Sequence, residues 1–147
     1  MLIVLEGVDG VGKTTLATLL SKTMNAGIIH ATRETPNDWD WFSEIMDLAK
    51  EKNIIADRFF WGQFVYQSQN ERKLTYSQLH ELEQRLTREG GQLIYVTADP
   101  ADIKARLGAR AEVLSLPLDT LQARYKFRVY TSECPVVIYN TSTGEVT

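Results

Sequence analysis

The chain has 147 residues, of which 44% are hydrophobic and 24% charged, a composition typical of a soluble globular protein. Its formal net charge of -3 argues against a polyanion as the main partner, and no apolar run approaches the length that spans a membrane. No linker or repeat divides the chain, so we expect one domain over 1–147, and the single cysteine and the absence of a signal peptide favour a cytoplasmic location.

The first predicted element is a strand at 2–5, a short apolar run typical of a strand buried on both faces. It leads into GVDGVGKTT, which matches the phosphate-loop pattern G-x-x-x-x-G-K-[ST] without a gap. In this pattern backbone N–H groups and a helix N-terminus bind phosphate, Lys13 adds positive charge and the Thr14 hydroxyl ligates Mg²⁺. The predicted ATP-binding residues are Gly7, Gly10, Gly12, Lys13, Thr14 and Thr15.

Strands and helices then alternate along the chain. Apolar residues at helical spacing predict a helix from the phosphate loop to Met24, another over 38–50, and a third that begins with a Thr75/Gln78 capping box and ends at 90–91. Further buried strands are predicted at 28–29, 54–56, 93–96 and 136–139. This alternation predicts an α/β P-loop kinase fold with about five parallel strands, helices on both faces, and the ligand beyond the carboxyl ends of the strands.

At the end of the 54–56 strand, Asp57 and Arg58 precede five aromatic residues within the segment FFWGQFVY. With LEGVDGVGKTT and ATRETP, the segment DRFFWGQFVYQ resembles the thymidylate kinase family, in which three such motifs occur in this order. Segments 98–110 and 136–142 resemble, more weakly, the approach to the family's lid and its last strand. The chain departs from the family because the thymine-gripping helix has no match, Thr35 interrupts Thr-Arg-Glu-Pro, and Phe59 and Gly62 replace a tyrosine and a serine.

The resemblance implies a role for each matched residue. Asp57 would order Mg²⁺ together with Thr14, and a lid at about 106–116 would close over the triphosphate. Lys13, Asp57, Arg58 and the lid residue Arg110 would be catalytic, while Arg106 would bind ATP. The acceptor would contact Asp9 through its sugar 3′-hydroxyl, Arg33 through phosphate, Tyr66 at the sugar 2′ position, and Gln63, Phe59 and Trp39 near the base.

Some of these residues also have a purely structural interpretation. Asp9 suits a turn in a glycine-rich loop, Arg33 suits a solvated pair with Glu34, and Trp39 extends the apolar face of the 38–50 helix. His30 and His80 lack metal-ligand spacing, so no chemical role is predicted for either.

The function expected from the motifs and the resemblance is ATP- and Mg²⁺-dependent phosphoryl transfer to a deoxynucleoside monophosphate, with dTMP as the first expectation and nucleotide biosynthesis as the setting. The partner would be a small-molecule nucleotide, and a homodimer is an open possibility. Two alternatives remain: a kinase of hydroxymethyluracil within DNA, which the missing base clamp would suit, and a nucleotide-binding module without turnover.

Overall fold

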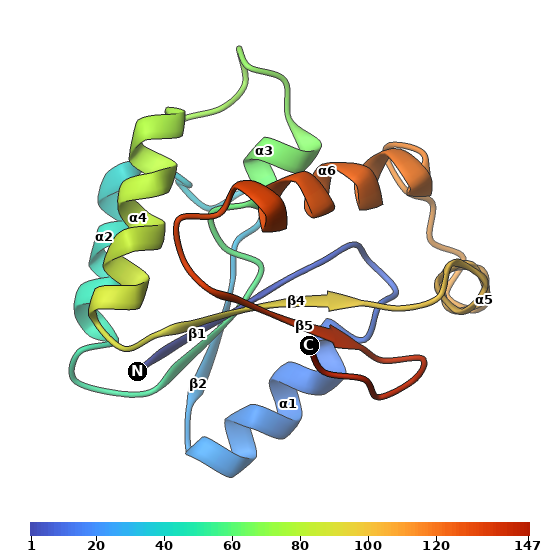
Figure 1. Ribbon diagram of the computed structural model, residues 1–147, viewed down its shortest axis with the longest axis horizontal. Coiled ribbons are helices and arrows are strands. Elements are labelled where there is room, and N and C mark those ends of the chain that lie inside the picture. Colours follow the sequence, from blue (N-terminus) through green and yellow to red (C-terminus); the bar gives the residue numbers. More distant parts are fainter.

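The computed structural model describes residues 1–147 and contains one parallel sheet with the strand order β2-β3-β1-β4-β5 (Figure 1). All four neighbouring pairs are parallel, and β1 lies at the centre. Each predicted strand is present: β1 (Leu2–Glu6), β2 (Gly27–His30), β3 (Ile54–Asp57), β4 (Gln92–Thr97) and β5 (Val136–Asn140). The predicted burial is wrong for β2, which is largely exposed, and only partly correct for β5, because both strands lie at the edges of the sheet. The carboxyl ends of β1 and β3 therefore bring the phosphate loop beside Asp57 and Arg58.

Helices cover both faces of the sheet, as the alternating pattern predicts. In Figure 1, α1 lies on one face, and α2, α4 and α6 lie on the other. The helices are α1 (Lys13–Met24), α2 (Trp39–Leu48), α3 (Gly62–Tyr66), α4 (Tyr76–Arg88), α5 (Pro100–Ala109) and α6 (Leu118–Thr131). None of them has the length and apolar character needed to cross a membrane.

The helix ends show the predicted capping. Thr75 Oγ1 accepts a hydrogen bond from the Gln78 N–H at 3.1 Å, and Gln78 Oε1 accepts one from the Thr75 N–H at 2.9 Å, which completes the capping box of α4. Asp38 caps α2 by accepting from the Trp41 N–H at 2.9 Å. The sequence pattern does not predict α3, α5 or α6. The first is only five residues long, and α6 buries Arg128 on its inner side, which interrupts its apolar stripe.

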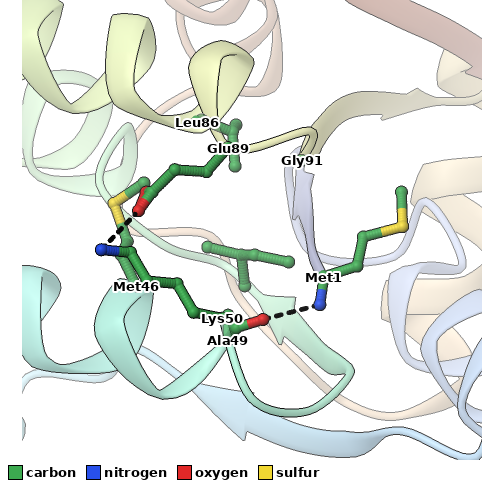
Figure 2. Close-up of a pocket in the computed structure, with 8 residues that line it drawn as sticks. Met1, Met46, Ala49, Lys50, Leu86, Glu89 and Gly91 are labelled. Carbon is green, nitrogen blue, oxygen red and sulfur yellow. Dashed lines mark hydrogen bonds and ion pairs between the residues drawn. The ribbon is translucent and has the colours of Figure 1, made fainter.

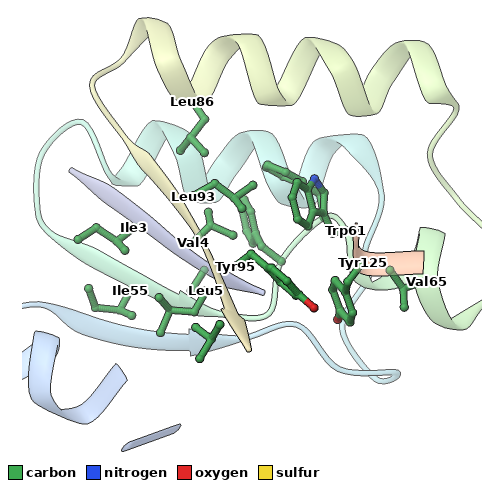
Figure 3. Close-up of a cluster of buried hydrophobic side chains, with 14 of the residues drawn as sticks. Ile3, Val4, Leu5, Ile55, Trp61, Val65, Leu86, Leu93, Tyr95 and Tyr125 are labelled. Carbon is green, nitrogen blue, oxygen red and sulfur yellow. The ribbon is translucent and has the colours of Figure 1, made fainter. Parts of the chain in front are cut away.

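The core is one cluster of 31 buried residues between the sheet and the helices, and Figure 3 shows part of it around β1 and β4. Most of the aromatic segment after Arg58 belongs to this core, because Phe59, Phe60 and Trp61 are at most 2% exposed. Phe59 and Phe42 pack edge to face, with ring centroids 4.8 Å apart. The rings therefore anchor the turn that carries Asp57 and Arg58.

A small cavity lies at the opposite, amino-terminal edge of the strands, between the start of β1 and the ends of α2 and α4 (Figure 2). The Met1 ammonium donates to Ala49 O at 2.7 Å, and Lys50 pairs with Glu89 at 3.4 Å. Its volume of about 20 Å³ is suited to a single water molecule. A nucleotide site must lie elsewhere.

Candidate active site

The phosphate loop needs glycine for steric reasons. Gly7 directly follows β1 and lies so close to β4 that a Cβ atom there would be 2.3 Å from Val96 O. Gly12, with φ of 98°, adopts a left-handed conformation immediately before α1. The loop thus curls tightly and delivers the chain to the N-terminus of α1, where unpaired N–H groups and the helix dipole favour an anion.

Lys13 lies on the inner side of this loop. The side chain is 6% exposed, and Nζ donates to Val8 O at 3.1 Å. Burial, reinforced by the charge of Arg58, lowers the pKa of Lys13 to about 8, while the nearby Asp57 and Asp9 carboxylates oppose this shift. A phosphate group in the loop would favour the charged ammonium and exchange for the Val8 carbonyl as its partner.

Thr14 and Asp57 form the pair predicted to hold Mg²⁺. Thr14 Oγ1 donates to Asp57 Oδ2 at 3.2 Å, and the Asp57 residue is 5% exposed. A hydroxyl and a carboxylate are hard oxygen ligands, and Mg²⁺ takes its remaining ligands from water and substrate phosphates, so these residues fit the ion. His30, to which the sequence assigns no role, lies 3.4 Å from the same carboxylate oxygen. The parallel register explains this, since it pairs His30 with Asp57.

Arg58 adopts a left-handed backbone conformation, with φ of 69°, immediately after β3. Its N–H donates to Leu5 O at 2.9 Å, which fixes the turn against β1. The guanidinium forms an ion pair with the Asp9 carboxylate and lies 5.2 Å from the centroid of the Tyr66 ring. Arg58 therefore joins the phosphate-loop motif, through Asp9, to the ring of Tyr66 in its own motif at the carboxyl edge of the sheet.

The buried carboxylate of Glu6, for which the sequence pattern predicts no role, fixes the turn after Arg58. Glu6 is fully buried, and its Oε2 accepts the Phe59 N–H at 3.1 Å and the Trp61 N–H at 2.9 Å. Burial raises the pKa of Glu6 to about 7, although these two hydrogen bonds and the charges of Arg58 and Lys13 act in the opposite direction. The signal available in the sequence was a lone acidic residue closing an apolar strand.

The pKa of Glu6 predicts a pH-dependent stability. Because its pKa is raised from 4.5, the folded state binds the proton more tightly than the unfolded state between about pH 4.5 and 7. Glu6 should thus lower the free energy of unfolding, by roughly 1–3 kcal/mol in all, as pH rises through this window. Urea unfolding of the parent and of Glu6→Gln at several pH values measures this slope as the difference between the two curves. Parallel curves would contradict it.

Two cavities adjoin this cluster. The larger, of about 1070 Å³, lies over the phosphate loop and the start of α1 and includes Arg106, Arg110 and Thr141 in its lining. The smaller, of about 530 Å³, lies beside Arg58 and the start of α3. Asp9 and Val113 line both cavities. A phosphate donor in the first and an acceptor in the second would meet at Asp9.

The smaller cavity contains five of the six predicted acceptor residues: Asp9, Arg33, Phe59, Gln63 and Tyr66. Trp39 does not line this cavity and packs half-buried against the core, which agrees with its structural interpretation. Gln63 faces the cavity, but its amide is already engaged. Its Nε2 donates to Asn37 O at 3.0 Å, and its Oε1 accepts the backbone N–H groups of Lys73 and Leu74, both at 2.9 Å.

The two arginines assigned to the ATP side differ in their surroundings. Arg106 lies within α5, where Nη1 donates to Gly10 O at 3.0 Å and to Thr141 Oγ1 at 3.2 Å. It therefore supports the phosphate loop from behind, and the first part of the expected lid is helical. Arg110, at the end of α5, is exposed and lies 3.6 Å from Glu112. Only this second arginine belongs to the connecting segment that borders both cavities.

Comparisons with solved structures agree with this fold. The YorR protein from Bacillus subtilis, solved in complex with phosphorylated GDP, is 28% identical, with 99% of this chain and 87% of that chain covered and a TM-score of 0.81. Deoxyadenosine kinase from M. mycoides with bound dATP is 19% identical (95% and 91% covered, TM-score 0.60). Thymidylate kinase from Candida albicans is 18% identical (96% and 84% covered, TM-score 0.51).

No protein-family model matches the chain, and no curated protein sequence does. The solved structures show that the chain has a P-loop fold of the nucleotide-kinase type, without singling out the thymidylate kinases among its members.

Proposed function

We propose that the protein is a nucleotide kinase that transfers the γ-phosphoryl group of ATP to a deoxynucleoside monophosphate, with Mg²⁺ as cofactor. The observation that carries this proposal is the meeting of two cavities at Asp9, one over a complete phosphate loop and the other beside Arg58. A nucleotide-binding module without turnover needs only the first cavity. The second gives an acceptor a place within reach of the γ-phosphate.

In the transfer, an oxygen of the acceptor phosphate attacks the γ-phosphorus, and the bond from that phosphorus to the β–γ bridging oxygen breaks, which leaves ADP. Lys13 and the loop N–H groups neutralise the charge that develops on the donor, and Arg58 orients the acceptor phosphate. Thr14 and Asp57 would hold Mg²⁺, which neutralises charge on the β- and γ-phosphates when bound. Arg58 must give up part of its contact with Asp9 as the acceptor phosphate arrives.

For the acceptor base we propose thymine, on the strength of the three motifs, and guanine as a second candidate. The second rests on the YorR complex with phosphorylated GDP, because that structure is the most extensively matched of those compared above. Gln63, the residue predicted to lie near the base, has its amide bound to backbone groups and favours neither candidate.

One acceptor screen tests the proposal. The protein is incubated with Mg²⁺–ATP and each of the common deoxynucleoside and ribonucleoside monophosphates, and with single-stranded DNA that contains hydroxymethyluracil, and products are identified by mass spectrometry. We expect a diphosphate from at least one deoxynucleoside monophosphate. Phosphorylated DNA with unreacted monomers would establish the DNA kinase instead. ATP binding without any product would establish the module without turnover.

Asp9→Asn tests the acceptor site. The substitution removes the charge that pairs with Arg58 and that would accept the acceptor's 3′-hydroxyl, while keeping the size of the side chain. We expect the KM for the acceptor to rise by the equivalent of about 1.5–3 kcal/mol, with the KM for ATP little changed. Asp102→Asn, at an exposed position in α5, is the matched control. An unchanged acceptor KM would leave Asp9 as a turn residue only.

Tyr66 gives a prediction about the sugar. Its hydroxyl is buried without a hydrogen-bond partner, and burial raises the pKa of Tyr66 to about 12, so only the ring faces the acceptor cavity. We expect Tyr66→Phe to keep the preference for deoxyribose and Tyr66→Ala to relax it about tenfold, because the ring supplies the bulk. The ratio of kcat/KM for deoxy and ribo acceptors measures this. A relaxed ratio in Tyr66→Phe would contradict the steric role of the ring.

A further inference from the structure

Two arginines share one pair of aromatic rings outside the two cavities. The rings of Phe64, in α3, and Tyr76, in α4, have centroids 5.1 Å apart. The Cζ atom of Arg72 lies 4.9 Å from both centroids, and that of Arg128, in α6, lies 5.7 Å from Phe64 and 5.3 Å from Tyr76. Arg128 is also 4.9 Å from the ring of Phe127, which is 57% exposed. Helices α3 and α4 therefore form an aromatic platform, to which α6 brings Arg128 and the loop before α4 brings Arg72.

Neither guanidinium has an anionic partner. Arg72 donates only to the neutral Tyr76 hydroxyl, at 3.0 Å. Arg128 is 5% exposed, and burial together with the charge of Arg72 lowers its pKa, against the opposing influence of Tyr76 and Glu83. Glu83 is the one carboxylate whose charge bears on Arg128. A cation buried beside a like charge is costly unless an anion or a set of hydrogen bonds compensates it.

Glu83 is already committed to other donors. Its Oε2 accepts the Trp61 Nε1–H at 2.8 Å, and its Oε1 accepts the Glu133 N–H at 3.3 Å. Arg128, in contrast, makes no hydrogen bond to the protein, and none of its guanidinium nitrogens is sealed from solvent. Its N–H donors therefore have no acceptor in the protein, and its guanidinium lies against the same two rings as that of Arg72.

We propose that Arg72 and Arg128 form an anion site that binds a phosphate group of a small molecule. Planar guanidinium forks match phosphate oxygens, and two forks on one platform can bind different oxygens of the same group. The exposed Phe127 ring next to Arg128 offers a surface on which a base attached to that phosphate can stack, so a nucleotide is the fitting ligand class. The net charge of -3 disfavours a polyanion here.

The site is separate from the phosphate loop and does not depend on the proposed phosphoryl transfer. It nevertheless contacts α3, the helix that also lines the acceptor cavity. Phe64 follows Gln63, which lines that cavity, and α6 also holds α3 through Arg124, whose Nη1 donates to Val65 O at 2.8 Å. An anion bound by both Arg72 and Arg128 would therefore stabilise the position of α3, because both guanidinium groups contact Phe64 in that helix.

NMR titration with inorganic phosphate tests this site on the full chain. The arginine Nε–Hε signals are recorded at constant ionic strength, with chloride as the reference salt. We expect saturable shifts at Arg72 and Arg128, distinct from any shifts in the backbone amides of the phosphate loop. Shifts that rise linearly without saturation, or that chloride reproduces, would overturn the site.

Three variants separate binding from general charge effects. Arg72→Gln removes one fork at a partly exposed position and should weaken phosphate binding at Arg128 at least about tenfold, or about 1.4 kcal/mol. Arg128→Lys keeps the charge but loses the planar fork and should also weaken it. Arg88→Gln, at an exposed position of α4, should leave it unchanged. Equal affinity in the parent and Arg72→Gln would refute the proposal, whether or not ATP is turned over.

Discussion

Replacement of Lys13 by alanine is expected to reduce kcat by the equivalent of about 2–4 kcal/mol, the cost of losing one preorganised charge contact in the transition state. The structure supports this expectation because Lys13 lies in the loop beside Asp57 and Arg58, and only the carbonyl of Val8 occupies its ammonium. That carbonyl is a weak competitor for a cation that a triphosphate can bind. Steady-state kinetics with saturating acceptor measures the loss.

The same substitution should leave the fold intact. Lys13 contributes one hydrogen bond, and its burial disfavours the charged form, so its removal relieves a desolvation cost. We expect a change of at most about 1 kcal/mol in the free energy of unfolding. Lys22→Ala, at an exposed position in the last turn of the same helix, is the matched control for both measurements. Parent-like turnover in a folded Lys13→Ala protein would exclude Lys13 from the mechanism.

The fold was largely predictable from local patterns. Five apolar runs without polar alternation predicted the five strands, and glycines and caps separated them from the helices. Burial on both faces holds for the central strands β1 and β3, whereas the edge strand β2 is largely exposed and the edge strand β5 is half-buried. Helices α5 and α6 could not be predicted from such patterns. Each has few buried apolar residues, and the inner side of α6 includes Arg128. Their helical state depends on tertiary packing rather than on a clear stripe.

The candidate site was predictable where one contiguous motif determines it. The phosphate loop with Thr14 follows from the loop pattern, whereas the role of Asp57 came from the family resemblance. The parallel pairing of β1 and β3 then brings Asp57 to Thr14. The contacts by which distant segments support the site could not be predicted from the sequence. Glu6 meets Trp61 across 55 positions, and Arg106 meets Gly10 across 96, and no local pattern specifies such pairs.

The aromatic segment shows why charge and ring surface occur together. Asp57 and Arg58 need rigid positions at the carboxyl edge of the sheet, and Arg58 itself adopts a left-handed backbone conformation. Buried rings fix that turn by packing, and the buried Glu6 carboxylate fixes its N–H groups. Trp41 contributes to the same packing from α2, with its ring centroid 6.1 Å from that of Phe59, and Trp39 packs half-buried against the core.

Trp61 connects this turn to a second buried carboxylate, and its replacement should have the largest effect on stability. It is fully buried, and Trp61→Ala should lower the free energy of unfolding by about 3–5 kcal/mol through the cavity it leaves. The substitution also removes the indole N–H that Glu83 accepts at 2.8 Å, which adds the cost of a carboxylate oxygen left without that donor. Urea unfolding measures the loss in free energy.

Trp61→Phe separates the two contributions, because it keeps most of the ring and loses the N–H donor. We expect Trp61→Phe to lower the free energy of unfolding by less than Trp61→Ala does. In the double variant Trp61→Phe/Glu83→Gln no charged carboxylate is left without its donor, so we expect part of this loss of stability to be recovered. A double-mutant cycle gives the coupling energy, expected to be about 1–3 kcal/mol. Additive effects would show that the hydrogen bond contributes nothing beyond packing. If Trp61 also positions Arg58 through the turn held by Glu6, the folded Trp61→Phe protein should show a raised acceptor KM with an unchanged KM for ATP.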